Sequence, residues 1–411
     1  MRRLPELFKK LEQQGSGSLA LIYLFRYLLR RGPIWARRQF EIRRDTAKIK
    51  TSETASIALR LGVSVIGGVG DHVIAARFMR DLRSSTEAFD FDVFSATPTV
   101  AEWIFSAVDG FKKCYQELVF RSVSHHYDLG LELSSVISVR PESREHAHNR
   151  TSEALKKVIE NVKTFGMEMS VFANNSFPMH GFLAQNLQFR NATRATSLHH
   201  ISDIQYGGNG FPLKVESGCL ARFGLERKRY ITVHNGFDAQ YITSGSRATK
   251  CYPHFNEVIT LLKEDFPDIL FVQIGSITSI PMSQVDLNLI RRTSLQEASA
   301  IIEGSVAHLD NESGMVHIAS CFSVPSCVVF GPTPSDYFAY ADNVSIRPKT
   351  CGCCWWIKED WMERCPRGFA EPICTYSQPP YEVAQAMTQL LARASVNYDA
   401  VRSASQSELK C

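Results

Sequence analysis

The chain has 411 residues, of which 44% are hydrophobic and 21% charged, a composition that excludes a disordered or fibrous protein. Its length exceeds what one compact core supports, so we expect two domains plus appendages. The net charge of +4 hides an asymmetry, because residues 1–50 hold thirteen Lys or Arg against four Asp or Glu. A basic arm on an acidic body predicts an anionic partner for the arm.

Residues 1–55 are predicted to form this arm as amphipathic helices. No secretory signal opens it, and its longest apolar run, residues 19–25, is far shorter than the roughly twenty residues that span a bilayer. Two interpretations stay open: the arm lies on an anionic membrane, or it docks on its own protein or on another subunit of a homo-oligomer. We therefore expect a cytoplasmic protein, either free or peripheral on the inner membrane face.

From residue 57 the pattern alternates between strands and helices. The first predicted series is strand 57–66, helix 71–82, strand 89–95, helix 99–108, strand 127–133, a surface loop at 140–150 and helix 153–163. The second is strand 230–234, helix 255–266, strand 269–274, helix 295–302, strand 307–310, helix 315–321, strand 326–330 and helix 381–394. Two such series predict an α/β protein with Rossmann-like domains at 56–220 and 221–395 that face a cleft, followed by a flexible tail at 396–411.

The sequence Ile66-Gly-Gly-Val-Gly-Asp-His72 follows a predicted strand and opens a helix. Gly68 and Gly70 would let the backbone approach a phosphate or an acceptor, although the spacing is not the dinucleotide fingerprint. Asp71 is interpreted either as a helix cap or as a general base that deprotonates an attacking hydroxyl. His72 is expected to be structural or to contact the acceptor.

Two further turns in the second half favour anion binding. Thr249 and Lys250 precede a helix, where they can hold the diphosphate of a leaving group. The sequence Glu312-Ser-Gly-Met-Val-His317 opens the next helix, and its backbone amides can face the same diphosphate. Glu312 could accept bonds from sugar hydroxyls, whereas His317 is either a donor contact or a core histidine.

Five of the eleven cysteines lie between residues 351 and 374. Cys351 and Cys354 form a C-x2-C pair, and Cys365 and Cys374 supply a second pair, a pattern that predicts one structural zinc or iron ion within a loop at 350–375. Free buried cysteines are the alternative. The density favours a metal in a reducing cytoplasm over disulfides. The neighbouring tryptophans, Trp355, Trp356 and Trp361, are expected to pack around the loop, with stacking on a sugar as the alternative.

These motifs resemble glycosyltransferase family 9, the bacterial heptosyltransferases of GT-B fold. The resemblance rests on Gly70-Asp71, Thr249-Lys250-x-Tyr-Pro253, the turn at 312–317 and Phe330-Gly-Pro-Thr333. It implies an inverting transfer that needs no metal, with Asp71 as the base and Lys250 on the donor phosphate. It also implies donor contacts from Thr249, Glu312, Ser313, Gly314, Met315, His317, Gly331 and Thr333. Glu312 and Tyr252 depart from the Asp and Trp that are usual in the family.

The cysteine pattern is similar to the autotransporter heptosyltransferases, in which cysteines hold iron and heptose is added to protein serines. The chain lacks that branch's N-terminal layout, so we expect a lipopolysaccharide or another surface glycan as acceptor and protein as the alternative. The expected donor is a nucleotide-diphosphate sugar, with ADP-heptose first. A nucleic-acid-binding protein is a rival that the aliphatic-rich arm and the tryptophans disfavour. A non-catalytic sugar-binding protein is another, which Glu312 permits.

Overall fold

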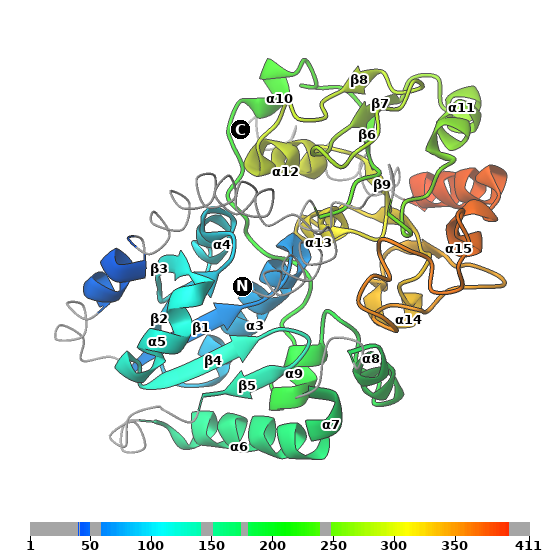
Figure 1. Ribbon diagram of the computed structural model, residues 1–411. Coiled ribbons are helices and arrows are strands. Elements are labelled where there is room, and N and C mark those ends of the chain that lie inside the picture. The colour runs from blue at the N-terminus through cyan, green and yellow to red at the C-terminus, as the bar shows by residue number, and fades with distance from the viewer. Residues whose placement is uncertain are drawn as a thin grey trace, which may run out of the picture.

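The computed structural model describes residues 40, 42–49, 59–140, 151–173, 180–238 and 248–393. These residues form two lobes, each built on a largely parallel sheet flanked by helices (Figure 1). The predicted α/β fold is therefore confirmed. Most of the predicted arm, the loop at 141–150 and the tail at 396–411 lie outside the described residues.

The first lobe contains a five-stranded sheet in the order β3-β2-β1-β4-β5. All neighbours are parallel except β4 and β5. The central strands are buried along most of their length, as expected for a sheet covered on both faces. The strands are β1 (Leu59–Val65), β2 (Phe89–Ser95), β3 (Phe111–Gln116), β4 (Leu129–Leu133) and β5 (Ile137–Val139).

The helices of the first lobe follow the strands in the right order for parallel crossovers. Pro98 begins α4, where its missing N–H costs nothing, and the Ser152 hydroxyl accepts the Leu155 amide at 3.2 Å to begin α6. The helices are α3 (Val69–Ser85), α4 (Pro98–Phe105), α5 (Phe120–Val123), α6 (Glu153–Glu168), α7 (Ser170–Ala173), α8 (His180–Phe189) and α9 (Ser197–Ser202), with 3₁₀ turns at Glu117–Val119 and Ser124–His126.

The second lobe contains a six-stranded, wholly parallel sheet in the order β11-β10-β9-β6-β7-β8. The strand order reverses between β6 and β9, which places a topological switch point at their carboxyl ends. The strands are β6 (Tyr230–His234), β7 (Leu270–Gln273), β8 (Leu287–Asn288), β9 (Ala307–Asn311), β10 (Ser326–Val329) and β11 (Val344–Ile346).

Helices of the second lobe cover both faces of its sheet. Ser294 and Glu297 form a reciprocal capping box at the start of α12, and the Ser313 hydroxyl accepts the Met315 amide at 3.1 Å to begin α13. The helices are α10 (Cys219–Arg222), α11 (Phe255–Asp265), α12 (Leu295–Glu303), α13 (Gly314–Cys321), α14 (Ser335–Phe338) and α15 (Ile373–Tyr376), followed by residues 380–393. Across the described residues, every helix is too short or too polar to cross a bilayer.

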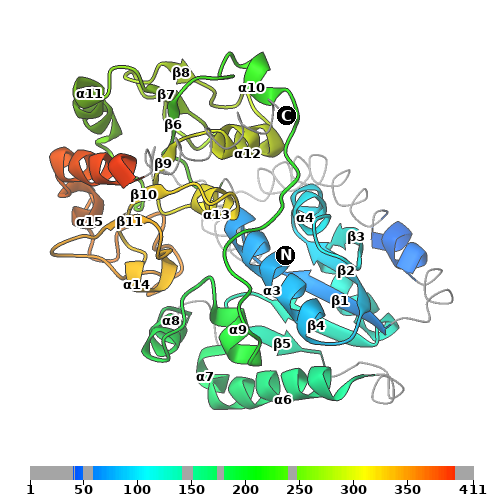
Figure 2. The ribbon, with the colours of Figure 1, turned by 180° about the vertical axis from the view of Figure 1, so that it is seen from behind.

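The two lobes meet where α3 crosses α13, side by side in both views (Figures 1 and 2). A Cβ on Gly70 would lie 2.4 Å from the His317 ring, so only glycine permits this approach. Arg77 of α3 is fully buried across the same contact, and its guanidinium donates to the Tyr340 hydroxyl at 2.9 Å and to Ser320 Oγ at 3.0 Å. The lobes are therefore joined by a packed and hydrogen-bonded interface.

Candidate active site

Asp71 occupies the first turn of α3, three residues after the helix cap Gly68. One carboxylate oxygen accepts the Gly68 amide at 2.9 Å. The other accepts from the guanidinium of Arg194 at 2.6 Å. Because the carboxylate caps the helix and also reaches a residue 123 positions away, the two interpretations of Asp71 do not exclude each other. The side chain remains 35% exposed, so a substrate hydroxyl can reach it.

Arg194 comes from the segment before α9 and is almost completely buried. Its guanidinium also donates to the Ser134 carbonyl at 3.1 Å and to Ser197 Oγ at 3.2 Å, which fixes its position. Burial alone would raise the pKa of Asp71, but the charge and hydrogen bond of Arg194 outweigh it and lower that pKa. Asp71 is therefore an ionised carboxylate at neutral pH, as a general base must be before it takes a proton.

His72 is buried within the first lobe. Its ring nitrogens bond to the Gly68 carbonyl and to Ser95 Oγ, both at 2.7 Å, and burial lowers its pKa. Because both ring nitrogens are engaged by the protein, the geometry favours the structural alternative for His72 over contact with an acceptor.

His317 lies at the centre of the interface between the lobes. Its Nδ1 bonds to the Tyr340 hydroxyl at 2.6 Å, while the opposite edge of the ring faces Gly70. Burial and the charges of Arg77, Arg194 and Lys250 lower its pKa to about 3, whereas Asp71 opposes them. His317 is thus a neutral histidine at neutral pH, and the charges of both Asp71 and Lys250 act on its pKa.

Lys250 is nearly buried, and its ammonium lies 3.6 Å from the Glu312 carboxylate. Thr249, beside it, has its amide bonded to the Met362 carbonyl and its hydroxyl to the Trp361 carbonyl, both at 2.9 Å. The Thr249 hydroxyl therefore anchors the loop instead of standing free for a ligand. Two residues of the predicted donor set, Lys250 and Glu312, are brought into a direct ion pair.

Of the remaining predicted donor residues, Ser313, Gly314 and Met315 form the start of α13, whereas Gly331 and Thr333 follow β10. Gly314 packs on the first lobe, because a Cβ there would lie 3.3 Å from the Gly70 amide nitrogen. A Cβ on Gly331 would meet Thr375 at 2.5 Å. The Thr333 hydroxyl is buried and has no hydrogen-bond partner among the described residues. Ser313 caps the helix, and Met315 is half-buried behind it.

The four cysteines of the predicted metal site, within residues 351–374 (the cysteine loop), lie near one another. Burial raises the pKa of Cys354 to about 11 and that of Cys374 to about 12, and the charges of the other cysteines, Cys351 and Cys365 among them, add to both shifts. Nevertheless, no group of three or more His, Cys, Asp or Glu in the described part of the chain is arranged to hold a metal ion. The four thiols lie near one another, but they are not arranged as the ligands of one metal ion.

The tryptophans beside the cysteine loop form a local core. Trp361 is buried with Phe237 and Met362, and its ring contacts Trp356, which in turn contacts Trp355. This arrangement favours packing over sugar stacking.

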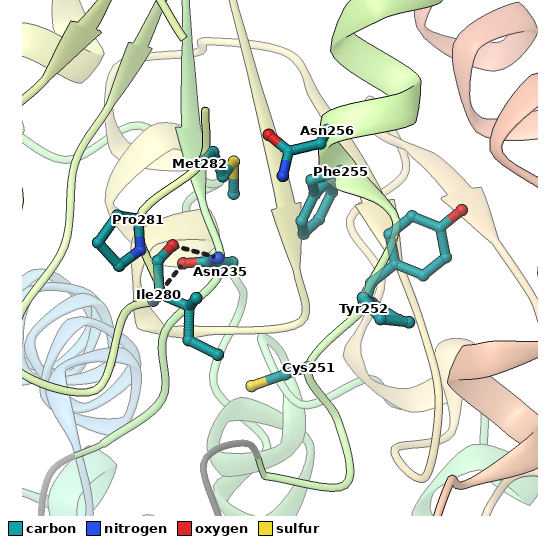
Figure 3. Close-up of a pocket in the computed structure, with 9 residues that line it drawn as sticks. Asn235, Cys251, Tyr252, Phe255, Asn256, Ile280, Pro281 and Met282 are labelled. Carbon is teal, nitrogen blue, oxygen red and sulfur yellow. Dashed lines mark hydrogen bonds between the residues drawn. The ribbon is translucent and has the colours of Figure 1, made fainter. Parts of the chain in front are cut away.

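A surface pocket lies at the carboxyl ends of β6 and β7 (Figure 3). The Asn235 amide donates to the Ile280 carbonyl at 2.8 Å and accepts the Ile280 amide at 3.3 Å, which holds the far wall. The near wall is Cys251-Tyr-Pro253, directly after Lys250. The pocket therefore adjoins the predicted donor loop but does not include Asp71.

Sequence reasoning missed Arg194 and assigned no role to His234 or Asp310. Arg194 lies in a polar stretch where an arginine is indistinguishable from a surface cation. His234 and Asp310 did carry a signal, because both end a predicted buried strand with a polar residue. His234 Nδ1 lies 2.9 Å from the Asp310 carboxylate, which is completely buried.

Comparison with known proteins identifies the second lobe. Residues 222–354 match the family model of glycosyltransferase family 9 (heptosyltransferase). No curated protein matches the chain by sequence.

Among solved structures, the chain resembles ADP-heptose lipopolysaccharide heptosyltransferase II of E. coli, with a TM-score of 0.51 and 16% identity over 82% of this chain and 100% of that one. It also resembles TibC, an iron-containing dodecameric glycosyltransferase of enterotoxigenic E. coli, with a TM-score of 0.52 and 12% identity over 81% of this chain and 78% of that one. These likenesses confirm the GT-B fold that the motifs predicted. The second lobe thus matches the model of glycosyltransferase family 9 (heptosyltransferase) over residues 222–354, and the chain shares its fold with solved heptosyltransferases.

Proposed function

We propose that the protein transfers a sugar, heptose from ADP-heptose in the first instance, to a hydroxyl of a lipopolysaccharide or another surface glycan, with inversion. The observation that carries this proposal is the meeting of the α3 and α13 N-termini, one from each lobe, around Asp71 and His317. An ionised carboxylate that can take a proton and two helix N-termini that favour an anion suit a reaction between a hydroxyl and a sugar diphosphate.

In this proposal Asp71 removes the proton from the acceptor hydroxyl as its oxygen attacks the sugar carbon. The bond from that carbon to the diphosphate breaks, and the leaving diphosphate gains negative charge. Lys250 and the amides around Ser313 and Gly314 stabilise that charge, which is the part of the barrier that fixed electrostatics lower most effectively. Glu312, which pairs with Lys250 at 3.6 Å, would accept a hydrogen bond from a sugar hydroxyl.

Transfer to protein serines is the second candidate. The feature that favours it is the cysteine loop, together with the likeness to TibC, an iron-containing glycosyltransferase. Incubation with ADP-heptose and either a lipopolysaccharide core or an autotransporter passenger domain distinguishes the two candidates by which acceptor gains heptose mass.

We also propose that Cys351, Cys354, Cys365 and Cys374 bind one structural iron or zinc ion. The fit is chemical: burial first, and then the charges of the neighbouring cysteines, raise the pKa of Cys354 and of Cys374, and a bound cation would favour their thiolate forms instead. The described arrangement is not yet a cage, so binding would draw the thiols together. The ion would tie the cysteine loop in place and takes no part in the transfer.

The general base is tested with Asp71→Asn, which keeps the shape of the side chain beside Arg194. Turnover of donor and acceptor should fall about 10²- to 10⁴-fold. Circular dichroism and the melting temperature would show that the fold survives. Near-normal turnover in this variant would remove Asp71 from the reaction.

A further inference from the structure

Large apolar side chains are exposed on three consecutive helices of the first lobe. Met167 of α6, Val171 of α7, and Phe182 and Phe189 of α8 are each at least half exposed, and Phe189 is 89% exposed. A single exposed apolar residue is ordinary in a soluble protein, whereas several on one surface mark an interaction site. These four residues therefore indicate such a site if they share one surface.

Contacts between the three helices place them on one surface. The ring of Phe172, the residue after Val171, lies 6.5 Å from the ring of Phe182, so α7 and α8 meet there (Figures 1 and 2). The Arg190 guanidinium, just beyond α8, lies 3.3 Å from the carboxylate of Glu168, the last residue of α6. We call the resulting surface the apolar corner, and its members are Met167, Val171, Phe182 and Phe189.

The helix α8 is apolar on two opposite faces. Leu183, Ala184 and Leu187 are buried and hold one face of the helix on the rest of the protein. Phe182 and Phe189, which are seven residues and so about two turns apart, share the opposite, exposed face. A helix that is apolar all round is typical of one that is covered all round. We therefore expect the exposed face of α8 to be covered by a partner.

The charges around the apolar corner decide which partner fits it. Basic and acidic side chains at this surface are equal in number: Lys156, Lys157, Lys163 and Arg190 against Glu153, Glu160, Glu168 and Asp203. Six of these eight form ion pairs of 2.6–3.3 Å. An anionic bilayer attracts basic surfaces, so a balanced surface gives it no electrostatic advantage. A second copy of the chain presents the same balanced surface, so no net repulsion opposes contact between two copies.

We propose that the apolar corner is the interface through which two copies of this chain associate about a two-fold axis. In such a contact the same patch faces itself, so the two phenylalanines of each copy are covered by the other copy. A specific interface buries about 800 Å² on each partner, so the charged rim is covered together with the four apolar side chains. The interface does not depend on which sugar or acceptor the enzyme uses.

The molecular mass of the full chain in solution tests this interface. Sedimentation velocity over a wide range of protein concentration should give twice the chain mass for the wild type, or a larger even multiple. In a double variant that combines Phe182→Ser with Phe189→Ser, we expect that mass to fall by half or more, because the apolar contact is lost. Both side chains are exposed in the single chain, so circular dichroism should show an unchanged fold.

A double variant that combines Ile277→Ser with Tyr381→Ser is the matched control. Both side chains are 61% exposed, but they lie in the second lobe and outside the apolar corner. This variant removes two exposed apolar side chains as well, and it should keep the mass of the wild type at every concentration.

A wild type that stays monomeric at every concentration would overturn the proposal. Wild-type mass in the variant of Phe182 and Phe189 would also overturn it, because the copies would then associate through another surface. Flotation of a monomeric wild type with anionic phospholipid vesicles, lost in the same variant, would assign the corner to a bilayer instead. The corner contains no residue of the proposed active site, so each of these results leaves the proposed function standing.

Discussion

At the scale of single residues, the protonation state of Asp71, the proposed base, depends on its partner Arg194. Asp71 differs from other carboxylates at helix starts because the buried guanidinium of Arg194 donates a hydrogen bond to its carboxylate at 2.6 Å. That charge keeps the carboxylate ionised, but it also makes the base weaker, since a low pKa means a smaller tendency to take a proton. If Asp71 is the base, as proposed, Arg194 both holds it in position and lowers its basicity.

Arg194→Met should change the pH dependence of turnover. In the wild type the pKa of Asp71 lies below its ordinary value of 3.8, so the acid limb of kcat/KM lies below the usual assay range. Without the guanidinium, the effect of burial is no longer outweighed by Arg194, so the pKa of Asp71 rises and the acid limb moves to higher pH. The measurement is kcat/KM from about pH 4 to 9.

Arg190→Met is its control, because Arg190 lies close in sequence but pairs at the surface with Glu168. Its pH profile should match the wild type. The lowered pKa of Asp71 also contributes to the stability of the wild type. That contribution is fully present above the ordinary pKa of the carboxyl group, and it is lost as the pH falls through the pKa of the folded state. An unshifted acid limb in Arg194→Met would contradict the role of Arg194.

Lys250→Met should reduce kcat/KM for the donor about 10²-fold, as expected when a charged group at the leaving diphosphate is lost. Glu312 would lose its cation at 3.6 Å, so Lys250→Arg provides the comparison that keeps the charge. Initial rates over a range of donor concentrations measure the effect. Equal donor kinetics in Lys250→Met and the wild type would place the leaving group elsewhere.

At the scale of elements, the contact of α3 with α13 governs how the lobes meet. Gly70→Ala would place a methyl group 2.4 Å from His317. To relieve this clash, either α3 or α13 would have to shift, and each helix carries residues of the proposed site. We expect a loss of about 1–3 kcal/mol in the free energy of unfolding, together with lower turnover. Thermal or urea unfolding measures the first and an assay the second.

Gly166→Ala in α6 is the comparison for this substitution. Nothing lies within 4 Å of its Cβ position, so it should stabilise the protein by about 0.5–1 kcal/mol and leave turnover unchanged. If Gly70→Ala behaves in the same way, the close crossing of the two helices is not required.

The elements show what a sequence can and cannot predict. Strand 89–95 and strand 230–234 match the structure because both are rich in the aromatic and β-branched residues that favour strands. The strand at 111–116 was missed because its exposed edge sequence, Phe-Lys-Lys-Cys-Tyr-Gln, lacks such a pattern. Asp71 and Lys250 were found through local motifs. The Asp71–Arg194 pair could not be found, because only the tertiary fold brings the two residues together.

At the scale of the whole molecule, the cysteine loop supports the donor loop. The Thr249 amide and hydroxyl both bond to carbonyls of residues 361 and 362, and Thr375 Oγ1 bonds back to the Thr249 carbonyl at 3.3 Å. The position of Lys250 therefore depends on how residues 351–375 are folded. A metal ion on the cysteines would act on donor binding through this contact, without touching the donor.

Cys365→Ser should accordingly release the metal, lower the melting temperature and weaken ADP binding together, since a structural ion contributes its binding free energy to the fold. Elemental analysis, thermal unfolding and calorimetry measure the three effects on one preparation. Cys353→Ser is the control, because Cys353 is exposed in the same loop and lies outside the proposed ligand set. If a variant loses its metal but binds ADP as tightly as the wild type, then the metal does not affect donor binding through the contact between the cysteine loop and Thr249. Equal metal content in Cys365→Ser and the wild type would remove Cys365 from the ligand set.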